Sequence, residues 1–166
     1  SDFTYVSTAQ GFVYVAFIID VFARYLVGWK VSCSARTDCV LDALEQVLCA
    51  RQPPFGRSGL IHHGDRGVQY VSIRCTECLA EAGIKLSVGS VGDSYDNALA
   101  ETINGLYKAE VIHRKSWQSL EKVEWATLTW VDGFNHRRLL EPIGYIPPAE
   151  AEAAYYRRLT ESAMAA

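Results

Sequence analysis

The chain has 166 residues, of which 49% are hydrophobic and 21% are charged, and its formal net charge at pH 7 is −3. This length suits one domain, and a high apolar content with a small net charge excludes a disordered chain. No apolar run reaches the ~18 residues of a membrane span, and acidic residues outnumber basic ones by 19 to 16, so composition alone indicates a soluble intracellular enzyme and gives no sign of DNA binding.

The first third of the chain predicts three strands in an antiparallel meander, over Phe3–Val6, Phe12–Ile19 and Tyr25–Cys33. The second run is apolar at every position, which is typical of a strand buried on both faces. Gly28 interrupts the third run and indicates either a bulge or a close approach by another segment.

Apolar residues then recur at helical spacing, at positions 40, 41, 44, 47 and 48, and Thr37 is the expected N-cap of this helix. A short strand, Gly59–His62, runs into a polar turn at 63–67, and it is followed by a helix over 72–82 and a strand over 84–88. These periodicities predict an alternation of helices and strands after the meander.

The last part of the chain predicts a Gly- and Ser-rich loop over Gly89–Asn97 and a helix over Ala98–Ile112. Ser119 is expected to cap a long helix whose inward stripe has positions 120, 123, 127, 130, 131 and 134. A final helix is expected to end near Leu159. The element order β-β-β-α-β-α-β-α-α, with this final helix after it, indicates one α/β domain.

Five cysteines, an odd number, indicate reduced thiols rather than a disulfide framework. Cys75 and Cys78 have the spacing of half a zinc site or of a redox pair. There is no second such pair, and the two lie inside a predicted helix, so they are expected to be ordinary helix cysteines.

Three carboxylates are placed where they can converge: Asp2 at the start of the first strand, Asp65 just after the fourth, and Glu101 near the start of a helix. Oxygen-only sites of this kind hold Mg²⁺, and two such ions ~4 Å apart catalyse phosphodiester chemistry. Lys108 follows Glu101 by seven residues, about 20° short of two helical turns. It therefore shares the face of Glu101 and would meet a phosphate there, unless the two residues are simply solvated surface.

Several separated segments, in order, closely resemble the integrase-core catalytic domain of bacterial insertion-sequence transposases, which are related to retroviral integrases. These segments are Asp-Phe-Thr-Tyr (2–5), Ile-Asp-Val-Phe-Ala-Arg (19–24), Val-Gly-Trp (27–29), His-His-Gly-Asp-Arg-Gly-Val-Gln-Tyr (62–70), Ser-Tyr-Asp-Asn-Ala-Leu-Ala-Glu (94–101), Lys-Ala-Glu (108–110), Phe-Asn-His-Arg-Arg (134–138) and Pro-Pro-Ala-Glu (147–150).

The resemblance implies a ribonuclease-H-like fold, a five-stranded mixed sheet flanked by helices. It places the family's catalytic and metal-binding D, D and E on Asp2, Asp65 and Glu101, and thirty-five residues, 66–100, separate the last two. It implies two Mg²⁺ or Mn²⁺ ions and a phosphoryl transfer without a covalent enzyme intermediate: water cuts at the element end, and the freed 3′-hydroxyl attacks another phosphodiester. Lys108 would contact the terminal DNA of the element.

The same resemblance implies element-end and target DNA as partners, at least a dimer when two ends are brought together, no membrane, and the bacterial cytoplasm. Residues 1–166 are expected to form a single catalytic domain, while the helix-turn-helix region that precedes it in relatives is absent from this sequence. Gly64 stands where many relatives have Ser, which leaves Asp65 itself in place.

Alternatives remain for several residues. Asp20 competes with Asp2 as the first metal ligand, although the resemblance favours Asp2. Asp93 flanks the loop, and Asp96 with Asn97 is expected to cap the Glu101 helix rather than to bind metal.

Other side chains are candidates for DNA contact. His63, Arg66 and Asn97 lie near the acidic positions, whereas His62 and His63 are also read as buried strand-end histidines. Two basic clusters, 114–115 and 136–138, either contact DNA or are ordinary surface charge. Trp117, Trp125 and Trp130 are expected in the core.

Three functions fit this sequence: a metal-dependent transposase core, a non-catalytic module that only dimerises or binds DNA weakly, and a hydrolytic nuclease of the same fold. The first is favoured, because Asp2, Asp65, Glu101 and Lys108 are all present.

Overall fold

The computed structural model describes residues 1–34, 36–51, 61–63, 77, 79–81, 83–87 and 93–164. Its centre is an antiparallel sheet of β1 (Asp2–Thr8), β2 (Gly11–Ile19) and β3 (Leu26–Ser32) in the order β1-β2-β3. This is the predicted meander, with each boundary within one or two residues of the expected one.

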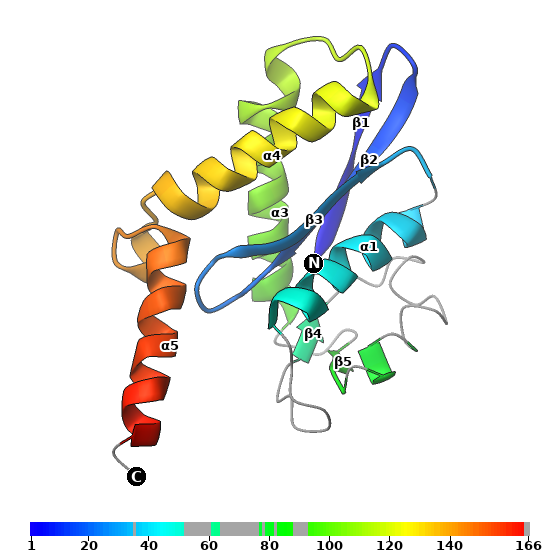
Figure 1. Ribbon diagram of the computed structural model, residues 1–166. Coiled ribbons are helices and arrows are strands. Elements are labelled where there is room, and N and C mark those ends of the chain that lie inside the picture. The colour runs from blue at the N-terminus through cyan, green and yellow to red at the C-terminus, as the bar shows by residue number, and fades with distance from the viewer. Residues whose placement is uncertain are drawn as a thin grey trace.

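Strand β2 is buried on both faces, as its continuous apolar run predicts. Because side chains alternate along a strand, Val13, Val15 and Phe17 enter one hydrophobic core, while Ala16 and Ile18 enter another. Helices α3 (Asp93–Glu110) and α4 (Leu120–Arg137) cover the first face and α1 (Arg36–Arg51) covers the second, so the sheet lies between two helical layers (Figure 1).

Gly28 has both features that its sequence position suggested. Ile18 pairs with Gly28 but Ile19 pairs with Leu26, so the register shifts beside the glycine. A Cβ atom on Gly28 would lie 2.3 Å from the carbonyl oxygen of Ala43 and 2.9 Å from a methyl of Val47. Only a residue without a side chain lets α1 approach β3 this closely.

Two short strands, β4 (Ile61–His63) and β5 (Lys85–Ser87), pair in parallel. Within the described residues, hydrogen bonds join the strands as a sheet of three and a sheet of two, and one five-stranded sheet stays a prediction. Residues 77 and 79–81 are helical, inside the helix predicted over 72–82. Cys75 and Cys78 lie outside the described residues, and Cys33 and Cys49 are free thiols.

Helix α3 (Asp93–Glu110) begins earlier than predicted. The expected loop over Gly89–Asn97 is thus wrong from Asp93 onward, and Asp96 and Asn97 cannot occupy the N-cap of a helix that has already begun. Helix propensity is a weak preference that the rest of the chain can override, so a segment of loop composition can still be helical. Thr37 is likewise inside α1, which starts at Arg36.

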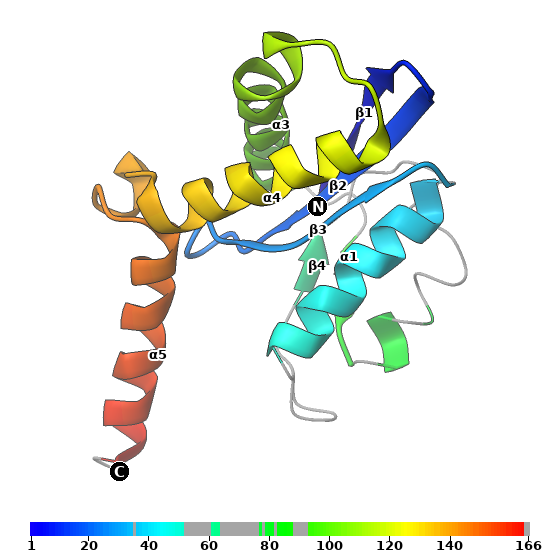
Figure 2. The same cartoon turned by 45° about the horizontal axis from the view of Figure 1, so that its top comes forward.

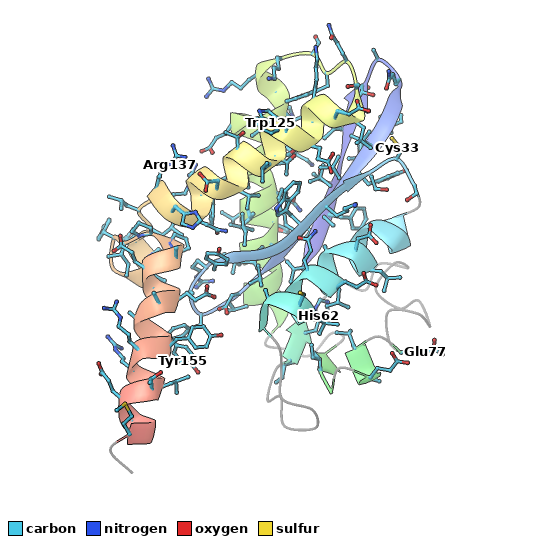
Figure 3. All side chains as sticks on the ribbon, in the orientation of Figure 1. Cys33, His62, Glu77, Trp125, Arg137 and Tyr155 are labelled. Atoms are coloured by element: carbon cyan, nitrogen blue, oxygen red, sulfur yellow. The ribbon has the colours of Figure 1, made fainter. Side chains whose placement is uncertain are left out.

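Helix α4 (Leu120–Arg137) crosses α3 on the same side of the sheet (Figure 2), with Ser119 at the predicted N-cap position. Trp117 is buried and Trp130 packs against the core, as expected. The expectation for Trp125 is wrong: it is 71% exposed and lies on the outer surface of α4 (Figure 3). It follows Val123 by two residues, which turns it about 200° away from the buried face.

The remaining elements are the 3₁₀ turns η1 (Ile112–Arg114) and η2 (Glu141–Ile143) and the helix α5 (Pro148–Met164), which extends past the predicted end at Leu159. Helix α5 packs on α4 and points away from the sheet (Figure 1). Among the helices that the structure describes, none is long and apolar enough to cross a membrane.

Candidate active site

Asp2, the first predicted metal ligand, is half-buried at the start of β1. Its Oδ1 accepts a hydrogen bond from the backbone N–H of Phe3 at 2.8 Å, and its Oδ2 accepts one from Nδ2 of Asn104 at 2.7 Å. A carboxylate offers about four acceptor positions, so each oxygen retains capacity for a further partner. The carboxylate is oriented by the chain without being saturated by it.

The partner of Asp2 belongs to the helix that carries Glu101. The face of helix α3 that packs on the sheet carries four buried side chains, Ala100, Ile103, Asn104 and Tyr107. Glu101 is exposed and lies at the edge of this face, one helical turn before Asn104. Packing of α3 on the sheet therefore brings the Glu101 position to the same end of β1 as Asp2.

The end of β4 adjoins the same place. Nε2 of His62 and Oγ of Ser1 are 3.1 Å apart, and His62 is 8% exposed. A hollow of about 60 Å³ lies here, lined by Ser1, Ile19, Val21, Ile61, His62, Leu99 and Ala100. In Figures 1 and 2 the N-terminus lies beside the lower end of α3 and above β4. The ends of β1, β2, β4 and α3 thus meet at one place.

This meeting point fits a divalent cation in its donor chemistry. Asp2 and Glu101 supply carboxylate oxygens, the ligands that Mg²⁺ prefers. Asp65 follows the end of β4 by two residues but lies outside the described part of the chain, so no group of three acidic, His or Cys side chains is found within that part. The structure brings the first and third positions of the predicted triad to one end of the sheet, while the position of Asp65 is a prediction.

Asn104 is the site residue that sequence reasoning missed. It is only 6% exposed, and its Oδ1 has no hydrogen-bond donor within the described residues. A hydrogen bond to a charged group contributes about 1.5–3 kcal/mol, whereas burying an unpaired polar atom costs about 1–3 kcal/mol. The gain from the hydrogen bond to Asp2 and the cost of the unpaired Oδ1 are of similar size, so the asparagine adds little net stability to the fold. Its signal in the sequence is a polar residue inside an apolar helical stripe, three positions after Glu101.

Asp20, the competitor of Asp2, has a structural use. Its Oδ1 accepts backbone hydrogen bonds from Phe22 at 2.8 Å and from Ala23 at 3.0 Å. An aspartate that accepts two successive backbone N–H groups closes a turn, here the turn between β2 and β3. Asp2 accepts a hydrogen bond from Asn104 on α3, and its preference over Asp20 as the first metal ligand stays a prediction.

Two arginines of the basic cluster at 136–138 form ion pairs with carboxylates of the chain. Arg137 donates to Asp132 at 2.7 Å, and Arg138 donates to Glu110. Burial opposes ionisation of Glu110, but hydrogen bonds from Arg138 and Trp130 outweigh it and lower the pKa of Glu110 below its usual value. Of the two interpretations of this cluster, the structure supports charge paired within the protein.

The sequence matches the integrase core domain model over residues 1–94, and a second integrase core domain model over residues 82–148. The chain belongs to the integrase core domain family.

The relatives of this integrase core domain are longer proteins. It is 65% identical over 166 residues to a transposase for insertion sequence element IS629 from Shigella sonnei, covering all of this chain and 55% of the relative. It is 58% identical over 159 residues to a putative transposase for element IS986/IS6110 from Mycobacterium tuberculosis, covering 94% of this chain and 57% of the relative. The chain thus spans little more than half the length of these curated relatives.

Solved integrase structures share the fold. The catalytic core domain of HTLV-2 integrase, in complex with magnesium, aligns with a TM-score of 0.61 at 14% identity, covering 89% of this chain and 88% of that one. A chain in the structure of a simian T-cell lymphotropic virus intasome in complex with PP2A regulatory subunit B56 gamma aligns with a TM-score of 0.67 at 13% identity, covering 90% of this chain and 51% of that one. At such low identity the likeness establishes the fold, the α/β class expected from the sequence.

The predicted DNA contacts of this integrase core domain are only partly described. Lys108 is half-buried on α3, two turns from Glu101. Arg66 lies outside the described residues, and the side chains of His63 and Asn97 are not among those described, although their backbones place them at the end of β4 and in the first turns of α3. These four contacts stay predictions.

Proposed function

We propose that this chain is the catalytic domain of an insertion-sequence transposase that cleaves and joins DNA strands at element ends. The observation that carries the proposal is the hydrogen bond between Asp2 and Asn104, because it fixes the start of β1 against the helix that carries Glu101. Family membership and the transposase relatives support the same reaction.

In this proposal Asp2, Asp65 and Glu101 hold two divalent cations, Mg²⁺ or Mn²⁺. The bound cations supply the Lewis acidity that activates the attacking oxygen and stabilises the leaving oxygen. The chain orients the carboxylates, and Lys108 binds a phosphate of the element end from the same face of α3. Arg66, His63 and Asn97 are proposed as further DNA contacts beside the acidic residues.

We also propose that residues 1–166 act as a single catalytic domain in the bacterial cytoplasm, with β1 to β5 forming one mixed sheet in the assembled protein. Recognition of the element ends would belong to another region, as expected from relatives about twice as long. Joining two DNA ends requires at least two copies in the working assembly, and the HTLV-2 integrase core has been solved in dimeric and trimeric forms.

The test is a cleavage and strand-transfer assay with Mg²⁺ or Mn²⁺ on a duplex that carries the terminal sequence of the element. Metal-ion catalysis contributes several kcal/mol to the transition state, so Asp65→Asn and Glu101→Gln should each slow both steps by about 10³-fold or more. Glu161→Gln, on exposed α5, should retain full activity.

Retained strand transfer in Asp65→Asn or Glu101→Gln contradicts the proposal. Cleavage without joining by the unaltered protein indicates a nuclease instead. DNA binding without either reaction indicates a non-catalytic module.

A further inference from the structure

The geometry points to Asn104 as the residue that positions the Asp2 carboxylate for cation binding. This inference rests on the proposed function and adds a fourth side chain to its site, one that binds no cation itself and acts through Asp2.

The contact is specific in its geometry. The bond from Nδ2 of Asn104 to Oδ2 of Asp2 is 2.7 Å long, and the backbone N–H of Phe3 is 2.8 Å from the other oxygen. Two donors, one on each oxygen, define the plane of the carboxylate. Hydrogen bonds to ligating carboxylates orient them toward the metal in this way.

The donor is itself held rigidly. Asn104 is 6% exposed and lies between Ile103 and Tyr107, both of which are buried in the core beneath the sheet. Burial keeps the side-chain amide of Asn104 away from solvent. The hydrogen bond therefore fixes the Asp2 carboxylate relative to α3. This bond joins the side chain of Asp2 to the helix that carries Glu101.

Asn104 also differs from the other buried asparagine of the chain. Asn135 uses both ends of its amide, accepting from the N–H of Leu26 at 2.9 Å and donating to its carbonyl at 3.1 Å. Asn104 uses only its N–H group, and Oδ1 has no donor among the described residues. Asn135 joins α4 to β3 and forms its hydrogen bonds with Leu26 rather than with a proposed cation ligand, which makes it a matched control.

The experiment titrates the metal-free chain with Mn²⁺ in a calorimeter, without DNA, and measures the melting temperature of every variant by circular dichroism. Asn104→Ala removes the donor while keeping a strong helix former. Because loss of such an outer hydrogen bond weakens metal binding by about 10–100-fold, the Kd for Mn²⁺ should rise by about that factor.

The control Asn135→Ala should lower the melting temperature but change the Kd less than about twofold, since Asn135 bonds to the backbone of Leu26 and to no proposed cation ligand. In the Asp2→Asn background, Asn104→Ala should cause no further rise in Kd, because a positioning residue has nothing left to position. Asn104→Leu, close to Asn in size, keeps the test valid if the alanine variant does not fold.

A Kd for Asn104→Ala and Asn104→Leu equal to that of the unaltered chain overturns the inference and leaves the proposed function standing, provided that Asp2→Asn still weakens binding. Equal Mn²⁺ binding by the unaltered chain and Asp2→Asn overturns the metal site of the proposed function, and the role of Asn104 with it. An equal loss of Mn²⁺ affinity in Asn135→Ala also overturns the inference. The weaker binding would then result from lower stability of the fold and not from loss of the hydrogen bond to Asp2.

Discussion

Gly28 and Asn104 show how single residues set the distance between the sheet and its helices. Gly28 admits α1 onto one face, where Ala43 and Val47 take the space of a side chain. Asn104 ties α3 to the other face through Asp2. Glycine has a low strand propensity and asparagine a low helix propensity. The neighbour that each residue contacts, α1 for Gly28 and Asp2 for Asn104, explains why it stands there.

Gly28→Ala should destabilise the protein by about 1–3 kcal/mol, because the new methyl must displace the backbone of α1. Gly105→Ala, in the exposed middle of α3 with nothing within 4 Å of the added atom, should instead stabilise by about 0.5–1 kcal/mol. Urea denaturation of the two variants measures both effects. A neutral Gly28→Ala would show that α1 is free to move away from β3.

Residue-scale prediction from sequence succeeded where one residue type admits few roles. Charge and spacing single out Asp2 and Glu101, and the structure brings them to the same end of the sheet, while their role as metal ligands stays a prediction. The sequence does not single out Asn104, because asparagine is usually a surface or turn residue. Its proposed role depends on the Asp2 carboxylate, which is distant in the sequence.

At the scale of elements, α3 and α4 are joined by two polar contacts under the sheet. The hydroxyl of Tyr107 lies 2.7 Å from that of Thr127, which in turn donates to the carbonyl of Val123. Burial raises the pKa of Tyr107 to about 12, against a smaller lowering by the Thr127 hydrogen bond, so it remains a neutral donor. Glu110 on α3 accepts from Trp130 on α4 at 2.7 Å and from Arg138 just beyond it.

The contact of Glu110 should make stability depend on pH. Its folded-state pKa lies below the ordinary 4.5, so its contribution is present above about pH 4.5 and is lost as the pH falls through the lowered value. Glu110→Gln should cost about 1 kcal/mol at pH 7, a modest amount because the pair is partly exposed, and the difference should shrink in acid.

Urea denaturation of the unaltered chain and Glu110→Gln at pH 7 and pH 3 checks this expectation, with Glu161→Gln as a surface control. A difference that stays constant over this range would assign the effect to packing rather than to charge.

Element boundaries were predicted best where hydrophobic periodicity is strong. The stripe of α4 placed Ser119 before the first helical residue, and the continuous apolar run of β2 placed its ends within one residue. The start of α3 differs from the prediction, because Asp93-Ser-Tyr-Asp-Asn has loop composition and helix propensity is only a weak guide to where a helix begins.

For the whole molecule, the net charge of −3 acquires a function in the proposal. Three acids are assigned to hold cations, and the arginines at 137 and 138 are paired with Asp132 and Glu110. Since DNA affinity depends on contacts between cations and phosphates, this chain should bind DNA chiefly when divalent ions neutralise its acidic site.

Affinity for a short duplex, measured by fluorescence anisotropy at constant ionic strength, should therefore increase about tenfold or more, or at least 1.4 kcal/mol, when Mg²⁺ replaces EDTA. The double variant Asp2→Asn/Glu101→Gln should lose most of this dependence on Mg²⁺. Equally tight binding in EDTA would show that basic side chains alone hold the DNA.

The sequence by itself determined the order of strands and helices, the faces that they bury and the family to which the chain belongs, since hydrophobic period and motif spacing are local properties of the chain. Only the tertiary structure decided which side chains meet: Asp2 with Asn104, 102 positions apart, and Leu26 with Asn135, 109 positions apart. Such contacts depend on how helices are set against the sheet, and packing of the whole core determines that arrangement.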